Sequence, residues 1–240
     1  MIIFLRSLLS PKTFSRFAKQ CIPWLYAGFA VFFTYGLGGG LVLSPPDYQQ
    51  GDAFRIIYVH VPCAFLSLLI YLIMATSAGI AAIWKIKLAD HITRTSAPIG
   101  ASFTLLALIT GALWGKPMWG TYWIWDARLT SELILLFLYL GYIAAISAFS
   151  QQRSAEQVGR IIVLVGAINI PIIHYSVYWW NTLHQGATLS KLAKPSMDAQ
   201  MLYPLLAMIV AFFLFYLAVL LTRMHRIISS PYANSATTGA

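Results

Sequence analysis

Charged side chains are scarce in this sequence of 240 residues, where Asp, Glu, Lys and Arg together make up only 10% of the chain. A soluble domain carries about 25% charged residues. Hydrophobic residues here reach 59%, and the mean hydropathy is +0.73. Because so much apolar surface needs lipid around it, the composition excludes an ordinary soluble domain and predicts a polytopic membrane protein.

Cysteine and acidic residues are scarce as well. Cys21 and Cys63 are the two thiols, and the topology below places them near opposite membrane faces, so no disulfide framework is expected. A CxxCH motif is absent, which excludes the covalent haem attachment of a c-type cytochrome. With 7 acidic against 16 basic residues the net charge is +9, which in a membrane protein indicates topology and contact with anionic lipids rather than nucleic-acid binding.

Six apolar segments are long enough for the roughly 20 residues that a helix needs to cross a bilayer. We therefore predict an all-α fold, a single membrane domain of six transmembrane helices over residues 1–240. The expected spans are Trp24–Leu43, Ile57–Ile83, Thr95–Trp114, Leu129–Phe149, Arg160–Tyr178 and Met201–Leu221. The other parts are an amphipathic in-plane segment at 1–22, a tryptophan-rich segment at 115–128, a loop at 179–200 and a tail at 223–240.

Glycine and proline mark places where these helices should pack closely or bend. The pairs with the spacing of a close helix contact are Gly36 with Gly40 and Gly111 with Gly115. We interpret both pairs as packing features without a chemical role. Pro62 and Pro171 lie inside expected spans, where a proline kinks a helix.

Basic residues fall unequally on the two sides of the predicted bundle. Eleven Lys and Arg residues flank one end of the spans and five flank the other. The positive-inside rule assigns the richer side to the cytoplasm, together with both termini. In a bacterium, the segments at 115–128 and 179–200 would then face the periplasm.

Tryptophan gathers in the stretch that follows the third span. Trp114, Trp119, Trp123 and Trp125 lie within twelve positions. If residues 118–126 are helical, Trp119, Tyr122, Trp123 and Asp126 share one face, and we expect a short amphipathic helix in the membrane interface. An aromatic belt usually only anchors a helix. Four indoles exceed what an anchor needs, and a flat aromatic surface suits a large planar ligand.

The five histidines separate by position. His91 and His225 lie among basic flanks and are expected at the surface, and His174 is expected to form a structural hydrogen bond within the bundle. His60 and His184 come from distant parts of the chain, yet the topology puts both at the face of the tryptophans. The combination predicts an iron held axially by two imidazoles, with a porphyrin plane on the indoles. No Cys or carboxylate cluster offers a tetrahedral zinc site instead.

Several charged residues border the same face. Arg55, Lys116 and Arg128 could meet porphyrin propionates, and lipid headgroups are an equally good interpretation of each. Asp126 could orient Arg128, accept from an indole N–H, or receive a basic residue of a partner. Arg128 and Glu132, four apart, could form an ion pair at the membrane entrance.

The segment at 119–126, WGTYWIWD, matches the WGxxWxWD signature of the haem-handling proteins of cytochrome c biogenesis. With six spans and one outer histidine on each side of the motif, the chain resembles the C component of the cytochrome c maturation system over nearly its whole length. The resemblance implies a multi-pass protein of the bacterial inner membrane that binds haem b non-covalently and is not an enzyme. His60 and His184 would be the axial ligands, and Trp119, Trp123, Trp125 and Asp126 the haem and chaperone platform.

The partners implied by the resemblance are a periplasmic membrane-anchored haem chaperone, the ATP-binding and membrane subunits of an ABC transporter, and a small single-span membrane protein. The absence of a Gly-Lys-Ser/Thr phosphate loop agrees with energy coming from a separate subunit. Three alternatives stay open: a haem b electron-transfer subunit, a haem lyase, and a scaffold anchored by its aromatic belt. The first commonly stacks haems between facing histidines inside the bundle, and the second has additional spans that this chain lacks.

Overall fold

The computed structural model describes residues 11–184 and 197–229, and all regular secondary structure in these ranges is helical. Six spans in the described part are long and apolar enough to cross a membrane. The elements are α2 (Pro11–Gly38), the π-helix η1 (Gly39–Leu43), the 3₁₀ helix η2 (Asp52–Ile56), α3 (Ile57–Trp84), α4 (Lys87–Trp119), α5 (Ala127–Ala148), α6 (Gln152–Gly166), α7 (Asn169–Trp179) and α8 (Ala199–Ser229). The predicted all-α, six-span membrane fold is confirmed, and the chain is a multi-pass membrane protein.

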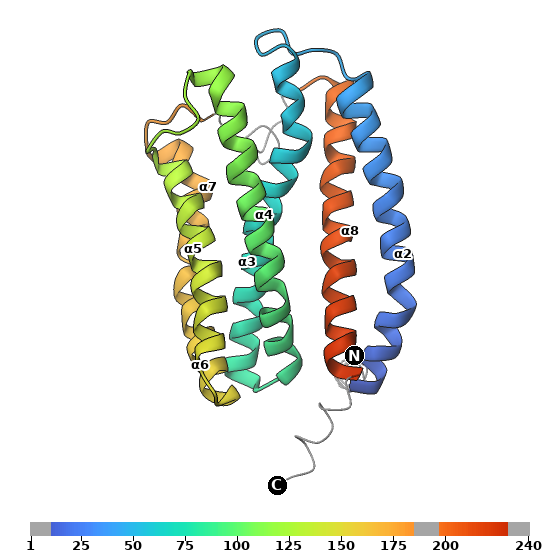
Figure 1. Ribbon diagram of the computed structural model, residues 1–240, viewed down its shortest axis with the longest axis vertical. Helices are drawn as coiled ribbons and strands as arrows, with labels where there is room; N and C mark the ends of the chain where they lie inside the picture. Colours follow the sequence, from blue (N-terminus) through green and yellow to red (C-terminus); the bar gives the residue numbers. More distant parts are fainter. Residues whose placement is uncertain (1–10, 185–196, 230–240) are drawn as a thin grey trace.

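The helices run side by side along the long axis of the molecule (Figure 1). The α2–α8 pair forms one side, α3 and α4 lie in the middle, and α5, α6 and α7 form the other side. Ser15 of α2 shares hydrogen bonds with His225 and Ser229 of α8, at 2.9 Å and 3.1 Å. The first and last described helices therefore reach the same end of the bundle.

Several buried polar side chains of the core form hydrogen bonds between helices, as a lipid environment favours. The buried hydroxyl of Tyr139 donates to the carbonyl of Ser67 at 2.7 Å, and Tyr216 shares a hydrogen bond of 2.9 Å with Ser96. These bonds join α5 to α3 and α8 to α4. The core thus fixes how the helices that carry the site are rotated about their axes.

Several span boundaries differ from the expected ones. The helix α8 runs eight residues beyond the expected Leu221, into the tail expected at 223–240. The first helix begins at Pro11, so residues 11–22 continue into the span, and residues 1–10 of the expected amphipathic segment lie outside the described residues. The helix α4 extends eight residues before and five beyond the expected Thr95–Trp114, because it runs Lys87–Trp119. The fifth span is broken at residues 167–168, four and three positions before Pro171, where a proline ring crowds the preceding turn. The α3 helix is continuous through Pro62.

The amphipathic helix expected over residues 118–126 is wrong. Instead, α4 ends at Trp119, and Gly120 takes the left-handed conformation at φ 77°, which commonly ends a helix. Residues 120–126 form no helix, and Asp126 then caps α5 by accepting a hydrogen bond from the Leu129 amide at 2.8 Å. Two strong local signals at Gly120 and Asp126 therefore outweigh the helical spacing of the aromatic residues.

Of the glycine pairs, Gly36 and Gly40 permit close packing as predicted. A Cβ on Gly36 would lie 2.6 Å from Met208 of α8, and one on Gly40 would lie 2.6 Å from the Tyr58 ring of α3. The contact at Gly40 packs the end of the first span, at η1, against the start of α3, close to the candidate site.

Candidate functional site

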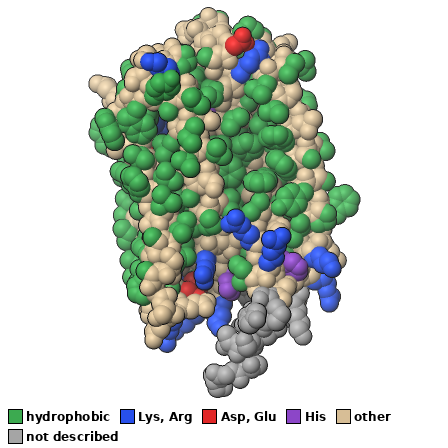
Figure 2. All heavy atoms as spheres, in the orientation of Figure 1, with side chains coloured by type: hydrophobic (Ala, Val, Ile, Leu, Met, Phe, Trp, Pro, Cys, Tyr) green, Lys and Arg blue, Asp and Glu red, His purple; other side chains and the backbone are tan. Residues whose placement is uncertain are grey.

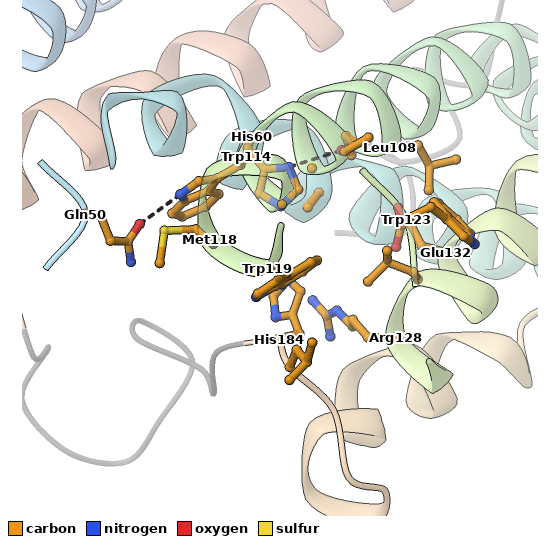
Figure 3. Close-up of a pocket in the computed structure, with 17 residues that line it drawn as sticks. Gln50, His60, Leu108, Trp114, Met118, Trp119, Trp123, Arg128, Glu132 and His184 are labelled. Atoms are coloured by element: carbon orange, nitrogen blue, oxygen red, sulfur yellow. Dashed lines mark hydrogen bonds between the residues drawn. The ribbon is translucent and has the colours of Figure 1, made fainter. Parts of the chain in front are cut away.

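A cavity of 220 Å³ lies at the end of the bundle opposite the α2 start and the α8 end (Figure 3). Its walls come from α3, α4 and α5 and from the segments before α3, between α4 and α5, and after α7. The lining residues are Gln50, His60, Ala64, Ala107, Leu108, Gly111, Ala112, Trp114, Gly115, Met118, Trp119, Trp123, Arg128, Leu129, Glu132, Leu183 and His184. Most of this lining is apolar or aromatic, with a few polar groups among them.

His60 projects from the first turns of α3 toward α4. Its Nδ1 lies 3.1 Å from the carbonyl oxygen of Ala107 and 3.1 Å from the hydroxyl of Thr110. Since a carbonyl oxygen can only accept, Nδ1 carries the proton and Nε2 keeps its lone pair. Histidines that bind metals commonly donate one ring N–H to a carbonyl oxygen in this way, which orients the ring so that the other nitrogen can bind.

His184 enters from the segment after α7. Its ring centroid lies 6.5 Å from that of His60, with the two planes inclined by 40°, and also 6.5 Å from that of Trp119. Imidazole nitrogens bind a metal such as zinc at about 2 Å, so two rings on opposite sides of one metal ion have centroids roughly 6 Å apart. The structure thus brings together the two histidines that the sequence singled out, at a separation that one ion can bridge.

The four tryptophans of the motif region do not act as one surface. Trp114, Trp119 and Trp123 line the cavity, and the Trp114 indole donates to the side-chain oxygen of Gln50 at 2.8 Å. Trp125 lies outside the lining, is 78% exposed, and meets Trp123 edge-on at 5.4 Å. The buried indole N–H of Trp123 has no hydrogen-bond partner among the described residues.

Some of the charged residues singled out in the sequence line the cavity, and others lie outside it. Arg128 lines the cavity and donates to the carbonyl of Ile173 in α7 at 2.6 Å. Glu132 is buried and accepts from the Ser67 hydroxyl at 2.7 Å, and among the described residues it forms no ion pair with Arg128. Arg55 lies outside the cavity lining and pairs with Asp52 at 2.9 Å.

Lys116 and Asp126 do not line the cavity, and both form hydrogen bonds within the chain near it. The Lys116 ammonium donates to the carbonyl of Gly120 at 2.9 Å, at the end of α4. The Asp126 carboxylate caps α5 with one oxygen and accepts from the Thr182 hydroxyl with the other. Neither of the expected bonds of Asp126 within the chain, to Arg128 or to an indole N–H, is present among the described contacts.

Three residues of the site gave no usable signal in the sequence. Gln50 lies in an irregular segment and reaches Trp114 across 64 positions, and Thr182 reaches Asp126 across 56. Gly111, interpreted as a packing glycine, leaves room for the His60 ring, because a Cβ there would lie 3.0 Å from His60 Cε1. Such pairings depend on how helices and loops meet, which no local pattern records.

The remaining histidines lie away from the cavity. His174 contacts the Tyr175 ring edge-on at 4.8 Å, and the hydrogen bond expected for it is absent from the described contacts. His225 bonds Ser15, and His91 is partly buried near the same end of the bundle. Within the described ranges, no group of three or more His, Cys, Asp or Glu side chains is placed to hold a metal ion.

Comparison with known proteins agrees with the sequence signature. The family model described as haem exporter protein C matches residues 4–238. Haem exporter protein C of Escherichia coli K12 is 49% identical over 224 residues, covering 93% of this chain and 90% of that protein. The protein of the same name from Haemophilus influenzae is 47% identical over 220 residues, covering 92% and 89%.

A relative at slightly lower identity matches over a similar extent. A Marchantia polymorpha protein, named as a CcmC-like mitochondrial protein of cytochrome c biosynthesis, is 45% identical over 202 residues, covering 82% of this chain and 86% of that protein. A family model that spans nearly the whole chain, together with relatives at this identity, leaves one assignment. The chain belongs to the haem exporter protein C family.

Proposed function

We propose that this protein holds haem b non-covalently in the cavity, with the iron between His60 and His184, and passes it to a periplasmic membrane-anchored haem chaperone. The observation that carries the proposal is the convergence of two imidazoles, 124 positions apart, across a cavity lined by three indoles. Iron with two protein ligands needs further donors, and a porphyrin supplies them in its own plane. Membership of the haem exporter protein C family supports the same ligand.

The chemistry of the lining fits a haem. Apolar and aromatic side chains suit the macrocycle, and Arg128 is the basic lining residue suited to a propionate. The N–H of Trp123, which has no hydrogen-bond partner in the described ranges, supports the view that a ligand or partner with acceptor oxygens completes this end of the molecule. Trp125, outside the lining and highly exposed, is better suited to the chaperone than to the haem.

The size of the cavity supports transfer rather than permanent storage. Its 220 Å³ is below the roughly 300–1,000 Å³ of sites that enclose most of a ligand. A haem would be only partly enclosed, so a chaperone could reach it without unfolding the bundle. Arg55, outside the lining, would meet a propionate only at the exposed margin, or a lipid headgroup.

The family and the charge pattern support a proposal for the wider assembly. We place the protein in the bacterial inner membrane, with both termini in the cytoplasm and the cavity at the periplasmic face. It would work with an ABC transporter, made of an ATP-binding and a membrane subunit, and with a small single-span protein. The chain itself would bind and deliver haem without acting as an enzyme.

Removal of either histidine tests the ligand assignment. We expect His60→Ala and His184→Ala to insert normally but to lose stable haem capture and chaperone loading. The absorption spectrum of the purified protein, with haem content and the amount of covalently loaded chaperone, measures both. Haem content and loading equal to the unmodified protein in both variants would overturn the assignment, and stoichiometric haem reduced by quinol would instead favour an electron-transfer subunit.

A matched tryptophan pair tests the aromatic lining in the same assay. Trp123→Ala is expected to weaken haem retention more than Trp84→Ala, because Trp123 borders the cavity and Trp84 ends α3 at the opposite end of the bundle. Equal losses in the two variants would mean that the indoles serve only as membrane anchors.

A further inference from the structure

We infer that Asp126, the last residue of the tryptophan motif, is a positioning residue that holds His184 in place through Thr182. The inference rests on the proposed haem function and gives Asp126 a role other than contact with haem or chaperone. It is carried by a chain of hydrogen bonds that joins the start of α5 to the segment after α7.

The chain of bonds can be followed atom by atom. The Leu129 amide donates to Oδ1 of Asp126 at 2.8 Å, which fixes the carboxylate at the N-terminus of α5. The Thr182 hydroxyl donates its one proton to Oδ2 of Asp126. The His184 amide donates to the Thr182 oxygen at 3.0 Å, so that oxygen is both donor and acceptor. The backbone of His184 is thereby tied to a helix end that also presents Arg128 to the cavity.

The residue types suit this task. A carboxylate at an N-cap has a second oxygen left to accept from elsewhere, and bonds to a charged acceptor are stronger than neutral ones. A hydroxyl is the smallest side chain that can donate to that oxygen while accepting from a neighbouring amide. Since Asp126 does not line the cavity, its influence on a bound haem would pass through this link.

The link matters because His184, unlike His60, is not part of a helix. The His60 ring is oriented by its own hydrogen bond to Ala107 on a neighbouring helix, at 3.1 Å. The segment after α7 has no helical frame at Thr182 to His184, so a hydrogen-bonded anchor limits where the second imidazole can lie. Loosening the anchor should therefore loosen one axial position and leave the other unchanged.

The test compares Thr182→Val, which keeps the shape of threonine without the hydroxyl, with Thr182→Ser, which keeps the hydroxyl. Each purified variant is titrated with hemin, and its spectrum and haem dissociation rate are recorded. Thr182→Val should lose the six-coordinate bis-imidazole spectrum and release haem roughly tenfold faster, the order expected for a lost bond to a charged group. Added imidazole should restore the six-coordinate spectrum, and Thr182→Ser should resemble the unmodified protein.

Two further variants separate the link from general damage. Asp126→Asn keeps an N-cap acceptor but replaces the second carboxylate oxygen with an amide, and should shift the spectrum in the same direction. Thr76→Val makes the same change on the exposed face of α3, where the hydroxyl donates to the Leu72 carbonyl of its own helix, and should have no effect. Without haem, amide hydrogen exchange at His184 should rise in Thr182→Val and stay unchanged in Thr182→Ser.

The outcomes distinguish this inference from the proposed function. If Thr182→Val keeps the spectrum, the dissociation rate and the amide protection of the unmodified protein while His184→Ala loses haem, the link is wrong and the ligand assignment stands. If His184→Ala itself keeps the unmodified spectrum, the ligand assignment fails. The exchange measurement on haem-free protein then still decides whether Thr182 anchors the segment.

Discussion

At the scale of single residues, the two histidines of the site differ in how they are held. His60 belongs to α3 and is oriented by Ala107 and Thr110 of α4. His184 follows α7 and is held through its backbone by Thr182. In the proposed function, the two axial positions would therefore be held by different means, one by helix packing and the other by a hydrogen-bonded segment between helices. The room for the His60 ring comes from the absence of a side chain at Gly111.

We predict that Gly111→Ala weakens haem retention roughly tenfold, or about 1.4 kcal/mol. The new Cβ would lie 3.0 Å from His60 Cε1, so the ring must move against its hydrogen bond to Ala107. The bundle should remain intact, because alanine favours a helix over glycine by about 1 kcal/mol. Hemin titration with thermal unfolding measures both effects.

Gly141→Ala is the matched control for that substitution. It makes the same change on α5, where a Cβ would meet nothing within 4 Å. It should keep haem retention and stabilise the helix slightly. Equal retention in the two variants would show that the space beside His60 is not limiting.

At the scale of elements, side chains that bond to main-chain carbonyls hold α7 against α5. Arg128 reaches the Ile173 carbonyl at 2.6 Å, and Asn169 reaches the Ser131 carbonyl at 2.9 Å. They fix α7 just after the break at residues 167–168 and so fix where the segment with His184 begins. At the other end of the same span, the Arg160 guanidinium of α6 donates two hydrogen bonds, of 2.8 Å and 2.7 Å, to the Asp90 carboxylate of α4.

We predict that Arg160→Ala lowers the free energy of unfolding by about 3 kcal/mol, because it leaves the Asp90 carboxylate largely buried without its partner. That side chain is only 11% exposed. Unfolding in detergent measures the loss, and an Asp90→Asn, Arg160→Gln double variant should recover part of it. Glu156→Gln is the control, since Glu156 lies 3.7 Å from Arg160 and is more exposed, which makes its expected loss under about 1 kcal/mol. Equal losses in the two single variants would contradict a specific role for Asp90.

At the scale of the whole molecule, the two ends of the bundle differ in chemistry. On the face shown in Figure 2, apolar side chains cover the middle, and basic side chains gather at the end where α2 begins and α8 ends. The other end carries the aromatic cavity. This polarity supports the orientation proposed above, with the cavity in the periplasm.

Cysteine labelling tests that orientation. In a Cys21→Ser, Cys63→Ala background, we expect Trp125→Cys to react with a membrane-impermeant maleimide in spheroplasts and Trp84→Cys to react only after lysis. Both positions are accessible, at 78% and 65% exposed, and they lie at opposite ends of the bundle. The reverse pattern would place the cavity in the cytoplasm and exclude delivery to a periplasmic chaperone.

The sequence by itself determined the class of protein, the six spans and the signature WGTYWIWD. These properties are local: a bilayer crossing is a run of apolar residues, and a motif is a run of particular letters. The common face of His60 and His184 followed from counting spans, since each crossing reverses the side of the next loop. The helix expected at residues 118–126 failed because Gly120 and Asp126, also local signals, were given less weight than aromatic spacing.

Only the tertiary structure decided which of these residues meet. It separated Trp125 and Arg55 from the cavity lining, assigned Glu132 to Ser67, and linked Asp126 to Thr182. Each outcome depends on the rotation of a helix about its axis or on the path of a loop between helices. Helix rotations and loop paths are set by packing across the whole bundle, such as the hydrogen bond of Tyr139 to Ser67, and no periodic pattern in the sequence encodes them.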